Sequence, residues 1–244
     1  MDHLESHFDD MADTWTSRYW TSPTFSSRLQ AIARVLTDEL VSTPASSCLD
    51  VGTGTGLFAD LCSRLTETVL GIDISRGMIE MASASAADRS HALQSNGVLL
   101  PPVGTLEFLS CGLSDERLRR RSFDLVTCLS VLEYQPDPEL TLRQARELLR
   151  PGGRIVYSVP LELSPLRATE RLLRVAPVRL VKQVRGAHYA EYVRLRVPQW
   201  PRTWASLPAR AGFDVSRRVD IPFRQTGFGR HLHSIRVVVA RAAS

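Results

Sequence analysis

The sequence predicts an α/β protein with a Rossmann-like fold, in which helices flank an open and mostly parallel β-sheet. A glycine-rich turn, G-T-G-T-G at residues 52–56, follows an apolar run at 48–51 and precedes a helical pattern. A second apolar run ends at Asp73. A third run, at 122–129, is mostly apolar, which is typical of a strand in the centre of a parallel sheet.

Composition and charge fit a soluble protein of one domain. The 244 residues, 43% hydrophobic and 23% charged, can bury a full core. No run approaches the roughly 18 apolar residues of a membrane span, and the start M-D-H-L-E lacks the features of a signal peptide. The four scattered cysteines favour buried thiols over disulfides or a zinc site. We therefore expect a cytoplasmic protein.

The elements before the glycine turn are expected to be helical. An aromatic-rich stretch at 7–25 predicts one or two short helices, and the pattern at 26–41 predicts a longer helix. The aromatic stretch either packs as an amphipathic helix on the sheet edge or lies over a ligand pocket and closes it. A short loop at 44–47 then leads into the first strand.

The glycine turn and the two carboxylates near it indicate a cofactor that combines a nucleoside with an amino acid. Glycine permits backbone angles that a Cβ forbids, and it lets a ligand lie against the main chain. Asp73, about 20 residues on, is placed to accept hydrogen bonds from the hydroxyls of a ribose. Asp50, just before the turn, would repel a pyrophosphate and attract an ammonium group. S-adenosylmethionine offers both a ribose and an ammonium group, so we expect it as the cofactor.

The next elements continue the alternation of helix and strand. Residues 74–87 have helical composition, with Ser75 as a possible N-cap. Residues 88–104 contain Asn-Gly and Pro-Pro pairs and are expected to form a long loop. A strand at 105–110 follows, and the residues at 111–113 would lie where an adenine sits at the carboxyl edge of an open parallel sheet.

Helices and strands are also expected in the second half of the chain. Residues 161–200 alternate apolar residues with arginines and are expected to form two short amphipathic helices separated by Pro177. The other expected elements are a helix at 136–149, a strand at 154–159, a helix at 204–211, and strands at 213–223 and 232–240.

Four motifs give the chain a family resemblance. D-V-G-T-G-T-G followed by G-I-D-I-S resembles motifs one and two of the class I S-adenosylmethionine-dependent methyltransferases. F-D-L-V-T-C-L-S-V-L-E-Y and L-R-P-G-G-R-I-V resemble motifs four to six of the same class, in the same order. This resemblance implies a seven-stranded sheet with an antiparallel last strand and an inserted helical cap.

The resemblance also implies that a single domain, residues 1–244, is divided into four parts with different roles. It would have an N-terminal helical lid (1–43), a cofactor-binding core (44–160), a substrate cap (161–200), and a C-terminal helix and strand pair (201–244). Lid residues would be Trp15, Tyr19 and Trp20. The cofactor-binding residues would be Asp50, Gly52, Thr53, Gly54, Gly56, Asp73, Ile74, Met78, Gly112, Leu113 and Leu129.

A narrower resemblance concerns the cap. R-G-A-H-Y-A-E-Y at 185–192, together with A-R-A-G-F, is similar to the O-methyltransferases of ubiquinone biosynthesis. It implies O-methylation of a small molecule in quinone or secondary-metabolite biosynthesis. That family commonly carries two acids and a histidine after the fourth strand, where this chain has Ser130, Glu133 and Tyr134. One acid of three is kept, so no metal is expected.

Methyl transfer from a sulfonium requires orientation of the acceptor and exclusion of water, and a hydroxyl acceptor must also lose a proton. We expect His188 to be the base, although a surface or packing role is the simpler interpretation of a lone histidine. Tyr134 would position the acceptor. N- or C-methylation, a non-catalytic S-adenosylmethionine binder and a nicotinamide-dependent oxidoreductase are the alternatives.

An arginine-rich segment indicates which kinds of molecule the protein could contact. Residues 161–202 carry nine cations against three acids. This segment is either a solvated face, or a contact for an anionic substrate, an acidic carrier protein or a negatively charged membrane surface without insertion. It lacks a run of aromatic stacking residues, so we expect a small-molecule substrate and no nucleic acid. The sequence indicates no oligomeric state.

Overall fold

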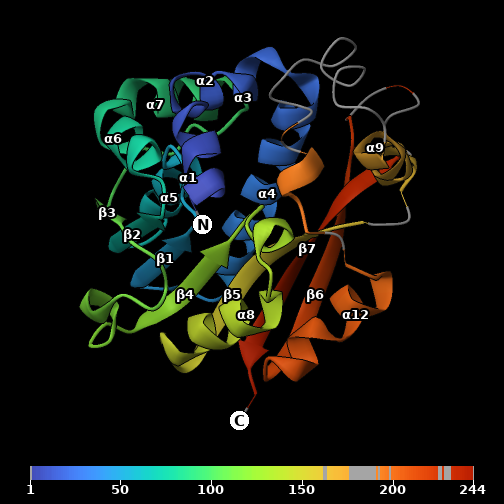
Figure 1. Ribbon diagram of the computed structural model, residues 1–244. Coiled ribbons are helices and arrows are strands. Elements are labelled where there is room, and N and C mark those ends of the chain that lie inside the picture. Colours follow the sequence, from blue (N-terminus) through green and yellow to red (C-terminus); the bar gives the residue numbers. More distant parts are fainter. Residues whose placement is uncertain are drawn as a thin grey trace.

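Seven strands form one sheet in the order β3-β2-β1-β4-β5-β7-β6 (Figure 1). The computed structural model describes residues 2–161, 164–175, 191, 193–197, 199–224, 227 and 232–243. Strands β1 to β5 pair in parallel, and β7 is antiparallel to both β5 and β6. The strands are β1 (Ser47–Val51), β2 (Thr68–Asp73), β3 (Thr105–Ser110), β4 (Phe123–Cys128), β5 (Leu149–Pro160), β6 (Phe213–Pro222) and β7 (His233–Ala242). The predicted mostly parallel sheet with an antiparallel last strand is confirmed.

Helices cover both faces of this sheet, and each face has its own apolar core. Side chains alternate between the two cores along β1, where Cys48 joins the core under α4, α5 and α7 while Leu49 joins the core under α8 and α12. The longer helices are α4 (Pro23–Ser42), α5 (Leu57–Ser63), α6 (Arg76–Ala84), α7 (Ala86–Ser95), α8 (Pro138–Glu147), α9 (Pro165–Val175) and α12 (Pro201–Arg210). Two short 3-10 helices are η1 (Glu116–Leu118) and η2 (Leu132–Tyr134).

One expected loop is a helix. Residues 88–104 were expected to be irregular because of their Asn-Gly and Pro-Pro pairs, but α7 extends to Ser95. Arg89, Ala92 and Leu93 form its buried stripe at helical spacing, and Asn96-Gly97 ends the helix, with Gly97 at φ +83°. The Asn-Gly pair does form a turn, but this turn ends a helix and is not part of a continuous loop.

The N-terminal region forms more helices than expected. Three short helices, α1 (Asp2–Asp9), α2 (Ala12–Trp15) and α3 (Arg18–Thr21), precede α4. In Figure 1 they lie at the end of the sheet to which the arrowheads of β1 and β4 point. The carboxylate of Asp9 fastens α1 to the start of α6, because it accepts hydrogen bonds from Ser75 Oγ (2.6 Å) and Gly77 N (2.9 Å).

The register of strand pairing shows which strand ends meet at one edge of the sheet. Val51 at the end of β1 pairs with Ile72 of β2 and with Cys128 of β4. The carboxyl ends of these parallel strands therefore meet at one edge, directly beneath α1–α3. In the described part of the chain, no helix has both the length and the apolar character needed to cross a lipid bilayer.

Candidate functional site

A cavity of about 680 Å³ lies at this edge of the sheet. The glycine turn, the ends of β2 and β4 and the loop after β3 line one side of it. The N-terminal helices, η2 and α9 line the other. Its volume is in the range of about 300–1,000 Å³ that small-molecule sites have, and its walls are mostly apolar with a few polar groups.

The glycine turn presents bare backbone to this cavity. Gly54 has a φ of +54°, and a Cβ there would lie 3.7 Å from Trp15 Nε1 and 3.9 Å from Met78 Sδ, in space that a ligand can use. Gly56 differs, because it lies outside the residues that line the cavity. A Cβ on Gly56 would come within 2.5 Å of the Phe108 ring, so this glycine allows α5 to pack closely on β3.

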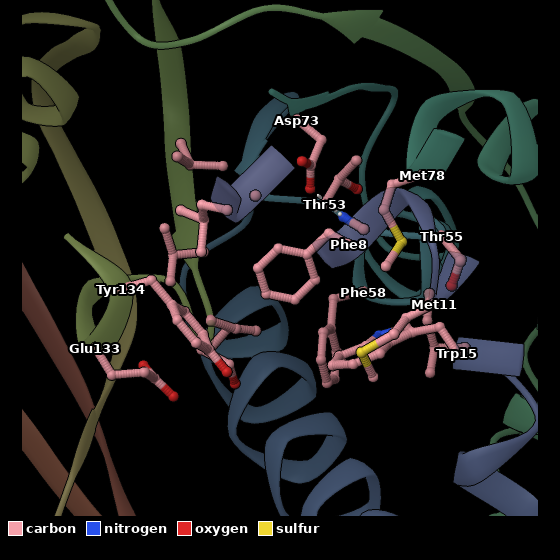
Figure 2. Close-up of a pocket in the computed structure, with 18 of the residues that line it drawn as sticks. Phe8, Met11, Trp15, Thr53, Thr55, Phe58, Asp73, Met78, Glu133 and Tyr134 are labelled. Atoms are coloured by element: carbon pink, nitrogen blue, oxygen red, sulfur yellow. Dashed lines mark hydrogen bonds between the residues drawn. The ribbon is translucent and has the colours of Figure 1, made fainter. Parts of the chain in front are cut away.

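Asp73 stands at the floor of the cavity, where Figure 2 shows its carboxylate next to Thr53. Its Oδ2 accepts a hydrogen bond from Gly54 N (2.8 Å) and its Oδ1 accepts one from Ser75 N (2.9 Å). Burial raises the pKa of Asp73, and the backbone donors oppose that shift. The carboxylate thus joins the glycine turn to the start of α6 and keeps further acceptor capacity for a ligand.

Asp50 occupies a different position from the one that the sequence suggested. Its Oδ1 accepts a hydrogen bond from Thr127 Oγ1 (2.5 Å), and its Oδ2 accepts one from Thr53 Oγ1 (2.7 Å). It is 2% exposed and is not among the cavity-lining residues. Burial raises its pKa to about 6. The geometry therefore gives Asp50 a supporting role behind the turn instead of direct contact with an ammonium group.

The structure brings most of the expected site residues together. Ten of them line the cavity: Gly52, Thr53, Gly54, Asp73, Ile74, Met78, Gly112, Leu113, Leu129 and Tyr134. His188 and the second expected cap helix lie outside the described residues. Trp15 and Tyr19 line the cavity as expected of a lid, whereas Trp20 packs against His91 with ring centroids 4.9 Å apart.

The sequence did not indicate how many N-terminal residues reach the cavity. Phe8 meets Trp15 and Tyr134 edge to face, at centroid distances of 5.9 and 5.3 Å (Figure 2). Leu4, Phe8 and Met11, spaced four and three residues apart, all line the cavity. Their helical spacing was the signal that could have revealed this face.

Arg28 of α4 is a cation that the sequence did not single out. It lines the cavity, its Nη2 donates a hydrogen bond to Ser130 Oγ, and its buried Nε has no partner in the described structure. Ser130 follows β4 with a φ of +64°, which is uncommon for a residue with a side chain, and its N donates to Ser158 Oγ (2.8 Å). Strained positions of this kind cluster at functional sites.

Buried charges from α9 and η2 form the far wall. Glu170 Oε2 accepts hydrogen bonds from Arg167 Nη1 (2.6 Å) and Arg196 Nη1 (2.7 Å), and all three side chains are buried. Glu133 is 3% exposed and lines the cavity, and its Oε2 has no partner among the described residues. This oxygen is free to accept a hydrogen bond from a ligand.

Comparison with known proteins identifies the family. A profile of the family described as "Methyltransferase domain" matches residues 25–217. The chain belongs to this methyltransferase family. The predictions of a methyltransferase and of S-adenosylmethionine as its cofactor are confirmed.

Curated relatives carry a more specific name. The chain is 28% identical over 212 residues to the ubiquinone biosynthesis O-methyltransferase of Xanthomonas campestris, a match that covers 85% of this chain and 82% of the relative. It is 24% identical over 236 residues to the protein of the same name from Coxiella burnetii, covering 88% and 91% of the two chains.

Solved structures share the fold. Magnesium protoporphyrin IX methyltransferase from Synechocystis PCC 6803, solved with bound S-adenosylhomocysteine, superposes with a TM-score of 0.67 at 15% identity and 98% coverage of both chains. The N-methyltransferase NodS from Bradyrhizobium japonicum gives a TM-score of 0.57 at 16% identity, with 93% and 91% coverage. The predicted class I methyltransferase fold is confirmed.

Proposed function

We propose that this methyltransferase transfers a methyl group to a hydroxyl oxygen of a small molecule in quinone or secondary-metabolite biosynthesis. The name shared by the curated relatives supports this choice. One observation carries it: a single cavity has the glycine turn and Asp73 on one side and, beside Tyr134 on the other, the buried carboxylate of Glu133, whose Oε2 has no partner among the described residues. Such a cavity can hold a methyl donor and a hydroxyl acceptor together.

The side of the cavity formed by residues 51–54, 72–78, 111–113 and 129 is here called the cofactor half. In this proposal Asp73 accepts hydrogen bonds from the ribose, and the backbone of Gly52 and Gly54 lies against the methionine part. The walls around the adenine are Ile74, Met78, Gly112 and Leu113. Asp50 and Gly56 act indirectly, by fixing Thr53 and by allowing close packing of α5.

Arg28 is suited to bind the carboxylate of the cofactor. S-adenosylmethionine carries a carboxylate, and a guanidinium with a buried, unpartnered Nε is a suitable donor for it. Ser130 holds the same guanidinium in place through its Oγ. We therefore add Arg28 to the residues proposed to bind the cofactor.

The side formed by residues 4–25, 133–135 and 167–173 is called the acceptor half, and Arg28 lies between the two halves. Bound S-adenosylmethionine supplies an electrophilic methyl group next to this half. Tyr134 and Glu133 would orient the acceptor hydroxyl by hydrogen bonds, while Phe8, Trp15 and Met11 keep water away. His188 stays a prediction from the sequence as the base.

The proposal extends to the substrate class, the organisation of the chain and its location. A cavity of this volume suits a small molecule better than a nucleic acid. We propose a lid (1–43), a core (44–160), a cap (161–200) and a C-terminal part (201–244). We also propose a cytoplasmic location and a contact of the basic cap with an acidic carrier or an anionic membrane surface.

The proposal is tested with the purified protein, methyl-labelled S-adenosylmethionine, and a panel of catechols, hydroquinones, amines and carbon acids. We expect labelled methyl ethers from the catechols or hydroquinones. S-adenosylhomocysteine should raise the unfolding temperature, because it binds only the native state. Methylation of the amines alone would contradict O-methylation, and stabilisation by NADH but not by S-adenosylhomocysteine would contradict the cofactor site.

A further inference from the structure

The acceptor half contains a histidine that the proposed function does not yet use. His7 of α1 lines the cavity and is only 3% exposed. Its ring meets Phe8 edge-on at 5.4 Å, and Phe8 in turn meets Tyr134 at 5.3 Å. His7 is thus linked through one aromatic ring to the residue proposed to orient the acceptor.

A carboxylate from another segment faces one nitrogen of this imidazole. Nδ1 of His7 lies 3.2 Å from Oε2 of Glu191, in the segment expected to form the cap. The contact is at ion-pair distance without the direction of a hydrogen bond, and such contacts commonly tighten when substrate binds. Nε2 has no hydrogen bond to any described residue, so this nitrogen is left for a ligand.

A catalytic base that is oriented by a neighbouring carboxylate is a recurring arrangement in enzymes. A carboxylate at Nδ1 fixes the tautomer in which Nδ1 carries the proton and Nε2 carries the lone pair. It also stabilises the imidazolium that forms when Nε2 takes up a proton. The pairing of His7 with Glu191 can provide both conditions at the wall of the acceptor half once the 3.2 Å contact tightens to a hydrogen bond.

We propose that His7, in place of the His188 expected from the sequence, is the general base of the methyl transfer and that Glu191 is its positioning residue. This inference rests on the proposed O-methylation. As the acceptor oxygen bonds to the methyl carbon, the hydroxyl proton moves to Nε2. The carbon–sulfur bond breaks, and its electron pair stays on a sulfur that becomes neutral. After the product leaves, the proton on Nε2 passes to solvent through the cavity, which restores the lone pair on this nitrogen, while Nδ1 keeps its proton toward Glu191.

The pair joins two segments that are far apart in the sequence. His7 belongs to α1, which is held against α6 through Asp9, while Glu191 comes from the segment expected to form the cap. The proposed base therefore depends on both segments being in place at the cavity wall, an arrangement that also helps to exclude water.

The acidity of the acceptor provides a test that a structural role would not pass. His7→Gln should lower turnover with catechol on the order of 10²-fold or more. With 4-nitrocatechol, which is largely ionised in mildly alkaline buffer and needs no base, the loss should stay below about tenfold. His3→Gln is the matched control, since His3 lies one turn earlier on the same helix and is exposed. It should leave both rates unchanged.

The unfolding temperature and the affinity for S-adenosylhomocysteine show whether the His7→Gln variant is folded. Given a folded variant, an equal loss with both acceptors, or no loss with catechol, would overturn the proposal. If the wild-type protein methylates no phenol while still binding S-adenosylhomocysteine, the proposed O-methylation fails first, and the assignment of a base fails with it.

The tautomer of His7 is a readout that does not depend on activity. Nitrogen-15 NMR of the protein labelled at histidine should show neutral His7 protonated at Nδ1, and Glu191→Gln should shift the proton toward Nε2. A wild-type His7 that carries its proton at Nε2 would overturn the proposal even if the enzyme methylates phenols, because that nitrogen could not then accept a proton.

Discussion

The cofactor half and the acceptor half of the cavity are built in different ways. The cofactor half comes from turns at the ends of neighbouring strands, and backbone hydrogen bonds such as that from Gly54 N to Asp73 hold it. The acceptor half comes from segments far apart in the sequence. Buried or partly buried charged contacts join them, as between Glu170 and Arg196 or His7 and Glu191.

Because of this difference, substitutions in the two halves of the cavity should have different effects. Strand ends in a parallel sheet are placed by the whole core, so the position of the cofactor half depends on the fold as a whole. The acceptor half depends on a few charged contacts between segments. Changes there should affect closure and the acceptor, while changes in the turn should affect the cofactor.

The largest expected effect concerns the buried ion cluster of the acceptor half. Glu170→Gln leaves the guanidinium groups of Arg167 and Arg196 without their shared carboxylate, so we expect a loss of about 3–5 kcal/mol of stability. The KM for the acceptor should rise while the affinity for S-adenosylhomocysteine is unchanged. Urea unfolding measures the stability, steady-state kinetics the KM, and calorimetric titration the affinity. Glu80→Gln, in the exposed pair with Arg76, should cost less than about 1 kcal/mol. An equal loss in the two variants would contradict the assignment.

A second prediction concerns pH and Asp50. Its folded-state pKa of about 6 lies above the ordinary value of 3.8, so between these values the native state binds more protons than the unfolded state. Stability therefore falls as pH rises from about 4 to about 6, by up to roughly 3 kcal/mol from this group. Asp50→Asn should remove this part of the fall, as measured by urea unfolding across that range. An unchanged pH slope would show that Asp50 titrates normally.

The third prediction addresses the cofactor half directly. Asp73→Ala removes the carboxylate proposed to accept hydrogen bonds from the ribose, and it should weaken S-adenosylhomocysteine binding on the order of 10²-fold, equivalent to about 2.7 kcal/mol. Calorimetric titration measures this. Glu67→Ala, at an exposed carboxylate just before β2, is the control and should bind normally. Normal binding by the Asp73 variant would remove Asp73 from the site.

The smallest expected effect separates backbone strain from packing at the turn. Gly56→Ala combines a φ of +81° with a Cβ 2.5 Å from the Phe108 ring, whereas Gly97→Ala has a φ of +83° and no atom within 4 Å. Both variants pay the strain of about 1–2 kcal/mol. Only Gly56→Ala adds a clash, so it should lose about 1–3 kcal/mol more in thermal or urea unfolding. Equal losses would show that the helix shifts without cost.

Local patterns were sufficient to predict the sheet and most of the cofactor half. Val51, Asp73 and Leu129 stand at the ends of apolar runs, and the strand period and glycine spacing locate such ends without knowledge of distant contacts. The expected loop at 88–104 failed for a local reason as well. Its Asn-Gly pair ends a helix whose buried face includes Arg89, a residue that a hydrophobic pattern does not count.

Short stretches of the sequence were enough to predict most strands and helices, the glycine turn and the class of cofactor, because each depends on residues close together in the chain. The three-dimensional packing was needed to show that Asp50 lies behind the turn, that Arg28 faces the cavity and that His7 meets Glu191. Those facts depend on which side chains from distant segments share a buried space. Packing and desolvation settle that choice, and neither follows a local period in the sequence.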